Sequence, residues 1–268
     1  EKRLNEFLPG KRIASVEIKE PVVIRALVRE GFAAGLQQAC FKGVKRHGPF
    51  LTFAFAQDVE MIIHPMLAGK FKVVLAGDKA GRSVCLSFHL DDGARLNYLD
   101  DKKMGKVYLV QTGQYEKIPR YLQQGVDILS AEFTPEKFSA LIAKQRKQVR
   151  VFLMDQTRLS AIGNAYADEI LFDARLHPKT FCNQLSEQEA QALYQSIKRV
   201  MNWGIREVEK AARPIEIKVR DHVKVRNRKD HPCPRCGAII RRAGVLGHDT
   251  FFCPQCQPAK RPQFITWT

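Results

Sequence analysis

The sequence predicts an α+β protein in which a β domain precedes a helical domain that carries a small cysteine-rich module. Three observations support this prediction. Short apolar segments between turn signals fill residues 11–110, a helical period begins at residue 134, and four of the seven cysteines gather near the C-terminus. Several short strands at this spacing are typical of a sandwich or a barrel. A chain of 268 residues with 45% hydrophobic content is long enough for two domains.

The first domain is predicted to be a β-sandwich over residues 1–112, followed by a linker over residues 113–133. Alternating or clustered apolar residues between turn signals such as AGDKAG and LDDGA identify its strands. The expected strands are RIASVEI, LTFAFA, MIIHPML, FKVVLA, SVCLSFHL and ARLNYL.

A helical domain is predicted over residues 134–212. Thr134 is a suitable N-cap and Pro135 suits the first helical position, so we expect one long helix that continues through QVRVFLM. A second helix begins after Ser186, because Glu189 three residues later completes a capping box.

The chain is strongly basic, with a formal net charge of +16 and a pI near 9.7. Residues 205–268 alone hold 14 Lys and Arg against 6 Asp and Glu, which favours a nucleic-acid-binding face over a merely well-solvated surface. No apolar run is long enough to span a membrane, no secretory segment opens the chain, and the cysteine count is odd. We therefore expect an intracellular protein, cytoplasmic or associated with the nucleoid, that contacts no membrane.

Residues 213–268 are predicted to form a zinc finger. Two C-x2-C pairs lie 16 residues apart, and their members are Cys233, Cys236, Cys253 and Cys256. Such pairs place four thiolates around one Zn²⁺ ion, and the metal supplies folding energy that a small module lacks. Four sulfur ligands leave no open position, so the ion is structural. The alternative, two disulfides, is disfavoured in a reducing compartment.

A glycine-asparagine pair opens the apolar segment SAIGNAYADEILF. At the start of a helix the first backbone N–H groups lack partners and the helix dipole is positive, so a phosphate fits there. Gly163 permits a tight turn and a close approach, and the Asn164 amide can donate to a phosphate oxygen. Taken alone, Asn164 is equally well explained as an ordinary N-cap.

Several motifs resemble one enzyme family. FLMDQTRLSAIGNAYADEILFDARLHP closely resembles the helix–two-turn–helix element of the formamidopyrimidine-DNA glycosylase and endonuclease VIII family, and HPCPRCGAII…GHDTFFCPQCQ resembles its zinc finger. RHGPFL, HPMLAG, YLDDKKMG and QGVDILSAEFT match its N-terminal β domain more weakly. The chain is thus similar to a divergent member of that family.

The resemblance implies a base-excision repair enzyme. Such an enzyme bends duplex DNA, flips the damaged nucleotide out, cleaves its glycosidic bond through a Schiff base and then cuts the strand by elimination. It implies that Gly163 and Asn164 clamp a DNA phosphate. We also expect DNA contacts from Arg150, just before this segment.

Several positions depart from the family's motifs. The family's nucleophile is an N-terminal proline in a motif like P-E-L-P-E-V-E, and aligning LPGKRI with the family's first turn puts that motif upstream of Glu1. Pro49 stands where the family motif R-x-G-K-Y/F-L has lysine, and His248 stands at the finger arginine that grips phosphate. His248 still donates one hydrogen bond, with a charge that depends on pH. Both changes predict altered elimination chemistry.

The residues that enter the base stack also differ. Leu67 replaces the methionine wedge, Met104 replaces the phenylalanine wedge, and Lys103 replaces the arginine that fills the gap left by the flipped base. Lys103 keeps the charge without the bidentate fork. His64 is expected to contact DNA, although a buried, hydrogen-bonded histidine is the alternative. For Leu67 and Met104 taken alone, core packing is the default.

Two functions follow. The first is a monomeric DNA glycosylase and abasic-site lyase that acts on oxidised bases in duplex DNA. The second is a catalytically altered or inert family member that binds damaged or branched DNA. A zinc-ribbon module of translation or transcription is more distant, because the order of the motifs matches the repair family. We favour the enzyme, because the missing motif belongs upstream of Glu1.

Overall fold

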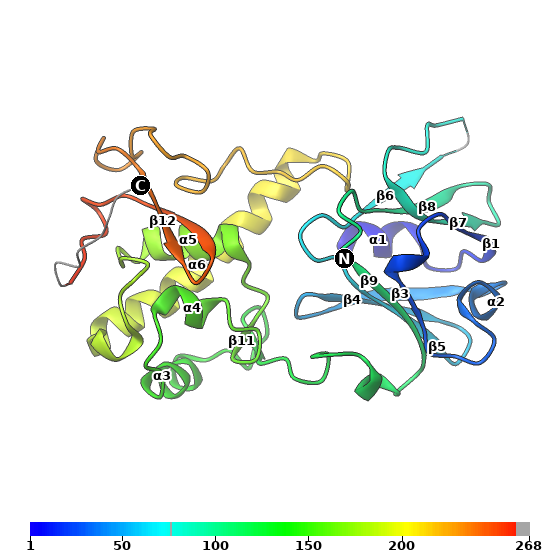
Figure 1. Ribbon diagram of the computed structural model, residues 1–268, viewed down its shortest axis with the longest axis horizontal. Coiled ribbons are helices and arrows are strands. Elements are labelled where there is room, and N and C mark those ends of the chain that lie inside the picture. The colour runs from blue at the N-terminus through cyan, green and yellow to red at the C-terminus, as the bar shows by residue number, and fades with distance from the viewer. Residues whose placement is uncertain (76, 261–268) are drawn as a thin grey trace. The chain divides into compact units, whose positions relative to one another are not determined.

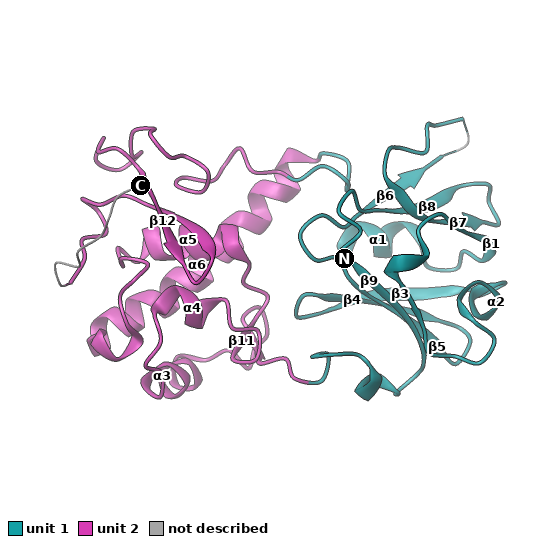
Figure 2. Cartoon of the chain, in the orientation of Figure 1, with its two compact units in different colours: residues 1–122, 213–218 teal, residues 123–212, 219–268 magenta. Residues whose placement is uncertain are grey.

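The computed structural model describes residues 1–75 and 77–260, which form two compact units (Figures 1 and 2). Unit 1 comprises residues 1–122 and 213–218, and unit 2 comprises residues 123–212 and 219–268. The first unit thus extends past the boundary at residue 112 that the sequence suggested. The zinc finger, predicted as a separate domain, shares one unit with the helices, and its last eight residues lie outside the described part of the chain.

Unit 1 consists of two sheets and a few short helices. The four-stranded sheet has the order β1 (Ile13–Ile18), β7 (Val84–Leu90), β8 (Arg95–Leu99) and β6 (Lys70–Val74). The five-stranded sheet has the order β2 (Ile24–Ala26), β9 (Lys106–Gln111), β5 (Val59–His64), β4 (Phe50–Phe55) and β3 (Phe41–His47). The helical turns are α1 (Lys2–Phe7), η1 (Pro21–Val23), α2 (Phe32–Leu36) and η2 (Tyr115–Lys117).

The core of unit 1 lies between the two sheets, which confirms the predicted sandwich. One apolar cluster takes buried side chains from both, including Phe53 and Met61 from one sheet and Phe88 and Leu96 from the other. Strand β5 is buried on both faces, because Ile62 packs into a second cluster on the far side of its sheet. This double burial explains the continuous apolar run in the sequence.

Two predicted strands are shorter in the structure. MIIHPML ends as strand β5 at His64, because Pro65 has no N–H for the ladder and Met66 has a φ of +49°. FKVVLA ends as strand β6 at Val74, and its final residue, Ala76, lies outside the described residues.

Unit 2 is mostly helical. Its helices are α3 (Pro135–Ala143), α4 (Val149–Leu153), α5 (Asn164–Asp173), η3 (Cys182–Gln184) and α6 (Glu187–Ala211). Its strands are β10 (Val126–Asp127) and β11 (Leu159–Ser160), which pair in parallel, and the hairpin β12 (Arg241–Val245) and β13 (His248–Phe252). Most of the buried apolar side chains of these helices share one cluster, whereas Phe172 of α5 packs with residues of the zinc finger.

Both predicted helix starts in unit 2 are confirmed. The Thr134 side chain accepts a hydrogen bond from the Lys137 N–H at 3.2 Å, and Ser186 and Glu189 form the reciprocal capping box. The expectation of one long helix after Thr134 is wrong, because the chain breaks into α3 and α4.

The break between α3 and α4 has a cause that lies far along the chain. The Val149 N–H donates to the Thr180 carbonyl at 2.8 Å, and the Cys182 N–H donates to the Lys147 carbonyl at 2.9 Å. These long-range bonds hold residues 147 and 148 in a non-helical conformation before α4 begins at Val149, and the helical pattern of the sequence carries no trace of them.

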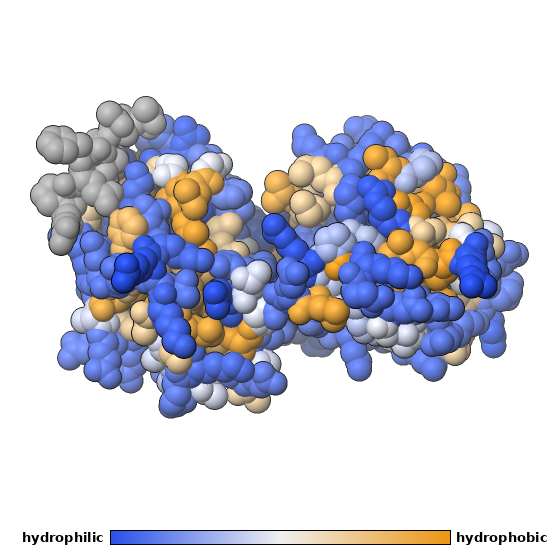
Figure 3. All heavy atoms as spheres, turned by 60° about the horizontal axis from the view of Figure 1, so that its bottom comes forward, coloured by the Kyte–Doolittle hydropathy of each residue, from blue (hydrophilic) through white to orange (hydrophobic). Residues whose placement is uncertain are grey.

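None of the described helices combines the length and the apolar character that a membrane crossing requires. Figure 3 shows a face that is largely hydrophilic, with apolar side chains in separate patches.

Candidate nucleic-acid interface and zinc centre

Two loops of unit 1 present apolar side chains to solvent. Leu67, in the loop after β5, is 67% exposed, and Met104, in the loop after β8, is 41% exposed. Core packing, the default reading of these two residues, is therefore excluded in the described structure. The backbone of the first loop is held by the Lys218 ammonium, which donates to the Leu67 carbonyl at 2.5 Å. The second loop is held by the buried Asp100 carboxylate, which accepts the Gly105 N–H at 2.7 Å.

The buried Tyr98 side chain packs against the backbone of both loops. Its hydroxyl lies so close to Gly69 and Gly105 that a Cβ atom on either glycine would overlap it. Glycine is required at both positions because the Tyr98 hydroxyl packs against both backbones, and at Gly69 the backbone of Pro65 also leaves no room for a Cβ atom. The two exposed apolar side chains therefore stand on a shared, rigid base.

Lys103 lies in the second loop, with a φ of +52° that few non-glycine residues adopt. Its ammonium pairs with the Glu20 carboxylate at 2.6 Å, and this hydrogen bond raises the pKa of Lys103. The Lys103 side chain is half-exposed and Glu20 is partly exposed, so the pair is weak and Lys103 can exchange Glu20 for another anion.

His64 ends strand β5 and is half-buried. Its Nδ1 atom accepts the Met66 N–H at 3.1 Å, and its ring packs edge-on against Phe50 with centroids 4.8 Å apart. Burial lowers the pKa of His64, so the ring is neutral at pH 7 and carries its proton on Nε2. His64 is therefore hydrogen-bonded through Nδ1, and its Nε2–H group can donate to a ligand.

Gly163 and Asn164 open helix α5 in unit 2. Gly163 has an extended backbone, with φ −106°, so the tight turn expected there does not require glycine. A Cβ built on it meets nothing within 4 Å, which leaves open space before the helix. Gly163 is the N-cap and Asn164 is the first helical residue, so the reading of Asn164 as the N-cap is wrong.

Arg150 lies directly behind Asn164. Its Nη2 donates to the Asn164 Oδ1 at 3.0 Å, which turns the amide nitrogen of Asn164 away from Arg150. The Arg150 side chain is 1% exposed. A guanidinium buried this deeply has no surface for a DNA backbone, so the direct contact expected of Arg150 is contradicted by its burial.

The buried charge of Arg150 is balanced by Asp168, which lies one turn after Asn164 on α5. Asp168 is fully buried and accepts from Arg150 at 2.9 Å and from Arg226 at 2.8 Å. It also accepts from the Thr250 hydroxyl at 2.7 Å. Sequence reasoning missed Asp168 and Arg226, although an acidic residue within an apolar helical segment was a usable signal.

The same hydrogen-bond network joins Asn164 to the zinc-finger hairpin. The backbone carbonyl of Asp249 accepts from Arg150 at 3.1 Å and from Arg226 at 2.8 Å. His248, exposed at the start of β13, directly precedes Asp249. The Asn164 amide and the hairpin backbone therefore share one buried guanidinium.

The four finger cysteines come together as predicted. The sulfur atoms of Cys233, Cys236, Cys253 and Cys256 all lie within 4.8 Å of one another. Tetrahedral zinc with Zn–S bonds of about 2.3 Å places its sulfurs about 3.8 Å apart, so this donor set fits one Zn²⁺ ion. The metal, when bound, closes the finger and supplies no open coordination position.

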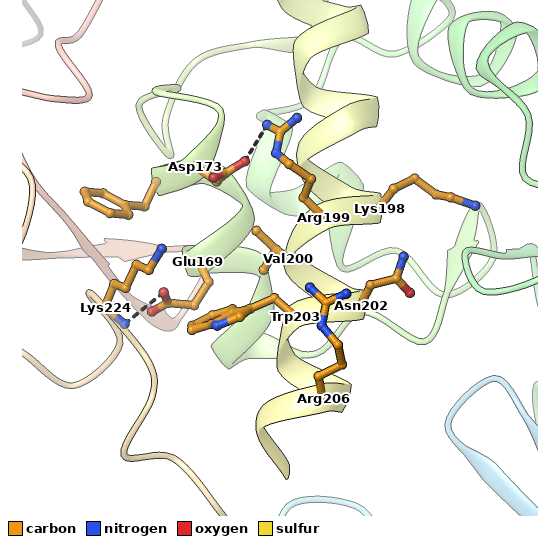
Figure 4. A pocket seen from close by; sticks show the side chains of 10 residues that line it. Glu169, Asp173, Lys198, Arg199, Val200, Asn202, Trp203, Arg206 and Lys224 are labelled. Carbon is orange, nitrogen blue, oxygen red and sulfur yellow. Dashed lines mark hydrogen bonds and ion pairs between the residues drawn. The ribbon is translucent and has the colours of Figure 1, made fainter. Parts of the chain in front are cut away.

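The finger is fastened to helix α5 by buried polar contacts. The Glu169 carboxylate accepts the backbone N–H groups of Lys224, Val225 and Arg226 at 2.9 to 3.0 Å, and burial raises the pKa of Glu169. Glu169 is one of ten residues that line a pocket of about 400 Å³, and Figure 4 shows their side chains. The Lys224 ammonium lies 4.9 Å from the centre of the Trp203 ring beside it.

Pro49 lies in the turn between β3 and β4, where it offers neither a charge nor a donor. The position at which this chain lacks the family's lysine is thus in a hairpin turn of unit 1.

Family models match three parts of the chain. They are the formamidopyrimidine-DNA glycosylase N-terminal domain over residues 1–107, the H2TH domain of the same enzymes over 124–214, and the zinc finger found in FPG and IleRS over 230–259. The order and the extent of these matches agree with the two units and the finger described above.

Individual proteins are similar over nearly the whole chain. The formamidopyrimidine-DNA glycosylase of Symbiobacterium thermophilum is 33% identical over 258 residues, which cover 93% of this chain and 83% of that protein. The Lactiplantibacillus plantarum enzyme is 31% identical over 257 residues, or 94% and 93% of the two chains.

Solved structures agree. A complex between the Lactococcus lactis Fpg and DNA with an abasic site has a TM-score of 0.85, 28% identity and 96% coverage of both chains. MutM (Fpg) from Thermus thermophilus has a TM-score of 0.83, 28% identity and coverage of 96% and 95%. With this likeness in sequence and in fold, the chain belongs to the formamidopyrimidine-DNA glycosylase family, and it is a DNA glycosylase and abasic-site lyase of base-excision repair.

Proposed function

We propose that this protein excises oxidised purines, formamidopyrimidines among them, from duplex DNA and processes the resulting abasic site slowly. The observation that carries the DNA-binding part of the proposal is the Asn164 amide, which the buried Arg150 orients at the N-terminus of α5. Lactococcus lactis Fpg has been solved with Fapy-dG and with abasic-site DNA, and such lesions are the substrates we assign here.

The DNA backbone is held by the start of helix α5. A phosphate there accepts from the Asn164 amide and from the unpaired N–H groups of the first turn, where the helix dipole favours an anion. Apart from its neighbours in the chain, no atom of the described residues lies within 4 Å of the position of a Gly163 Cβ, so a phosphate oxygen can approach the backbone. Arg150 acts as a positioning residue, because its guanidinium fixes which atom of the amide points outward.

The exposed side chains of unit 1 take the place of the extruded nucleotide. Leu67 and Met104 supply apolar surface against the neighbouring bases, and Lys103 exchanges Glu20 for the DNA. His64 donates from Nε2 to a phosphate while Nδ1 stays bonded to the Met66 N–H. These roles rest on the motif positions together with the exposure of each side chain.

The chemistry begins when an amine attacks C1′ of the flipped nucleotide. The C1′–N bond breaks with its electron pair leaving on the protonated base, and the sugar ring opens to give an iminium ion. Loss of the 2′ proton then expels the 3′ phosphate. Pro49 and His248 remove a lysine and an arginine that the family motifs place near this elimination, so base release outpaces strand cleavage.

Borohydride trapping tests the proposal. The full-length natural chain is incubated with duplexes that carry an oxidised guanine, a formamidopyrimidine or an abasic site, and base release and strand cleavage are timed separately. We expect a covalent complex, and His248→Arg should speed strand cleavage without changing base release. No trapped complex and no base release from duplexes that still bind tightly would overturn the proposal.

A repair enzyme of this class acts where chromosomal DNA lies. We therefore place the protein at the nucleoid, a placement that imaging of a tagged chain tests.

A further inference from the structure

The tip of the zinc-finger hairpin carries an unexpected residue. Strands β12 and β13 are joined by Leu246 and Gly247, with Val245 paired to His248. The two turn residues have φ values of +46° and +75°. Two-residue hairpin turns with positive φ at both positions favour Asn-Gly or Asp-Gly, and leucine adopts this conformation at a cost.

Leu246 is also the most exposed of the large apolar residues in the described part of the chain, at 76%. The other large apolar side chains of the hairpin are buried, for example Val245 at 2% and Phe252 at 1%. Both the backbone conformation and the exposure of Leu246 therefore oppose the stability of the finger, and packing within the finger does not explain the residue.

The position of the hairpin relative to the phosphate clamp points to an occupant. Arg150 Nη2 donates both to Asn164 Oδ1 at 3.0 Å and to the Asp249 carbonyl at 3.1 Å. The start of β13 therefore lies beside the clamp residue Asn164. Arg241 and Arg242 are exposed on β12. A polyanion held by the clamp thus meets a basic hairpin with an apolar tip.

We propose that Leu246 is a DNA-binding residue that packs against the deoxyribose and base edges of the duplex held by the clamp. The inference rests on the DNA-binding function proposed above. An apolar contact of this kind adds affinity without neutralising a phosphate. Leu67, the second most exposed large apolar residue in the described chain at 67%, has the same character in unit 1.

The test uses Leu246→Asn, because asparagine tolerates positive φ and removes only the apolar contact. Binding to a duplex with a stable abasic-site analogue is measured by fluorescence anisotropy over a series of salt concentrations. We expect about tenfold weaker binding, the loss of one buried leucine contact. The slope of log Kd against log salt should not change, because no counterion is released at this residue. Thermal stability and zinc content should equal or exceed those of the wild type.

Two further variants sharpen the test. Leu246→Met keeps an apolar tip and should bind within about twofold of the wild type. Ile239→Thr changes another apolar residue of the same finger, 42% exposed and away from the tip, and should leave affinity unchanged.

Wild-type affinity of Leu246→Asn would overturn the inference, and so would a reduced salt slope, which would trace the effect to a neighbouring cation. A concentration-dependent dimer that Leu246→Asn abolishes would assign the tip to a second copy of the chain and also overturn it. If the wild type itself bound no duplex, the proposed function would fail first and this inference with it.

Discussion

Under the proposed function, the loops of unit 1 and the clamp formed by Gly163 and Asn164 in unit 2 prepare side chains for DNA in opposite ways. In unit 2 the polar atoms are fixed before DNA arrives, because the Asn164 amide is held by Arg150 and Arg150 is neutralised by the buried Asp168. In unit 1 the backbone is fixed and the side chains are free. Leu67 and Met104 project into solvent from loops that pack on Tyr98.

The difference matches what each region must recognise. Phosphates are alike at every step of the duplex, so a rigid amide and a helix N-terminus suit all of them. An opened base stack varies with the lesion and the neighbouring bases, and an adaptable apolar side chain on a firm base suits it better. Rigidity in the clamp therefore rests on buried charge, whereas rigidity in the loops rests on close backbone packing.

The largest effect should follow from breaking the buried charge of unit 2. Asp168→Asn leaves Arg150 buried without a counterion, so we expect a loss of about 3–5 kcal/mol in the free energy of unfolding. The matched control is Asp173→Asn on the same helix. Asp173 pairs with the exposed Arg199 at 2.7 Å, and its loss should cost about 0–1 kcal/mol. Equal losses for the two variants, measured by urea unfolding, would show that burial does not set the strength of the clamp.

Removing the amide itself should weaken DNA binding more than it weakens the fold, where Arg150 loses one of its acceptors. Asn164→Ala deletes a hydrogen bond to a charged phosphate, worth about 1.5–3 kcal/mol, so affinity should fall about tenfold or more. Asn202→Ala, an exposed asparagine on α6, serves as the control. Anisotropy and thermal melting are compared for both. Unchanged affinity of Asn164→Ala at moderate salt would remove the clamp from the proposal.

A smaller and more selective effect is expected in unit 1. Leu67→Ala should slow release of an oxidised base about tenfold, because less apolar surface holds the gap open. Binding to an abasic-site duplex, which has no base to extrude, should change much less. Leu122→Ala, an equally exposed leucine of the same unit, is the control. A uniform loss of affinity for both duplexes would mean that Leu67 contacts DNA without acting as a wedge.

The sequence predicted the structural features that depend on residues close to one another in the chain. The caps at Thr134 and Ser186 depend on residues three positions apart, and the zinc ligands depend on two short spacings. Both were confirmed. The break between α3 and α4 depends on hydrogen bonds to residues 180–182, some thirty positions away, and no window of the helical pattern contains it.

The candidate site shows the same limit. The motif matches identified Asn164 and Leu67 as candidate DNA-binding residues. They did not predict the neighbouring residues that position these two side chains. Arg150 was expected at the DNA surface because a motif match conveys charge and position without burial. The structure instead gives it a buried partner, Asp168, whose part in the clamp the motif match did not reveal.

The smallest effect is expected at His64, where pH tests whether the half-buried ring acts as a neutral donor. Burial holds the pKa of His64 below its usual value of about 6.5, so the ring is mostly neutral between pH 7.5 and 8 and its contribution to DNA affinity should be constant there. A depressed histidine pKa also means that its share of the folding stability is present above about pH 6.5 and is lost as pH falls through the lower, folded-state value.

His64→Gln keeps a donor and should bind DNA within about threefold of the wild type, whereas His64→Leu should lose the hydrogen bond at every pH. A difference in log Kd between wild type and His64→Leu that titrates with a midpoint above pH 6.5 would show that the charged ring binds DNA.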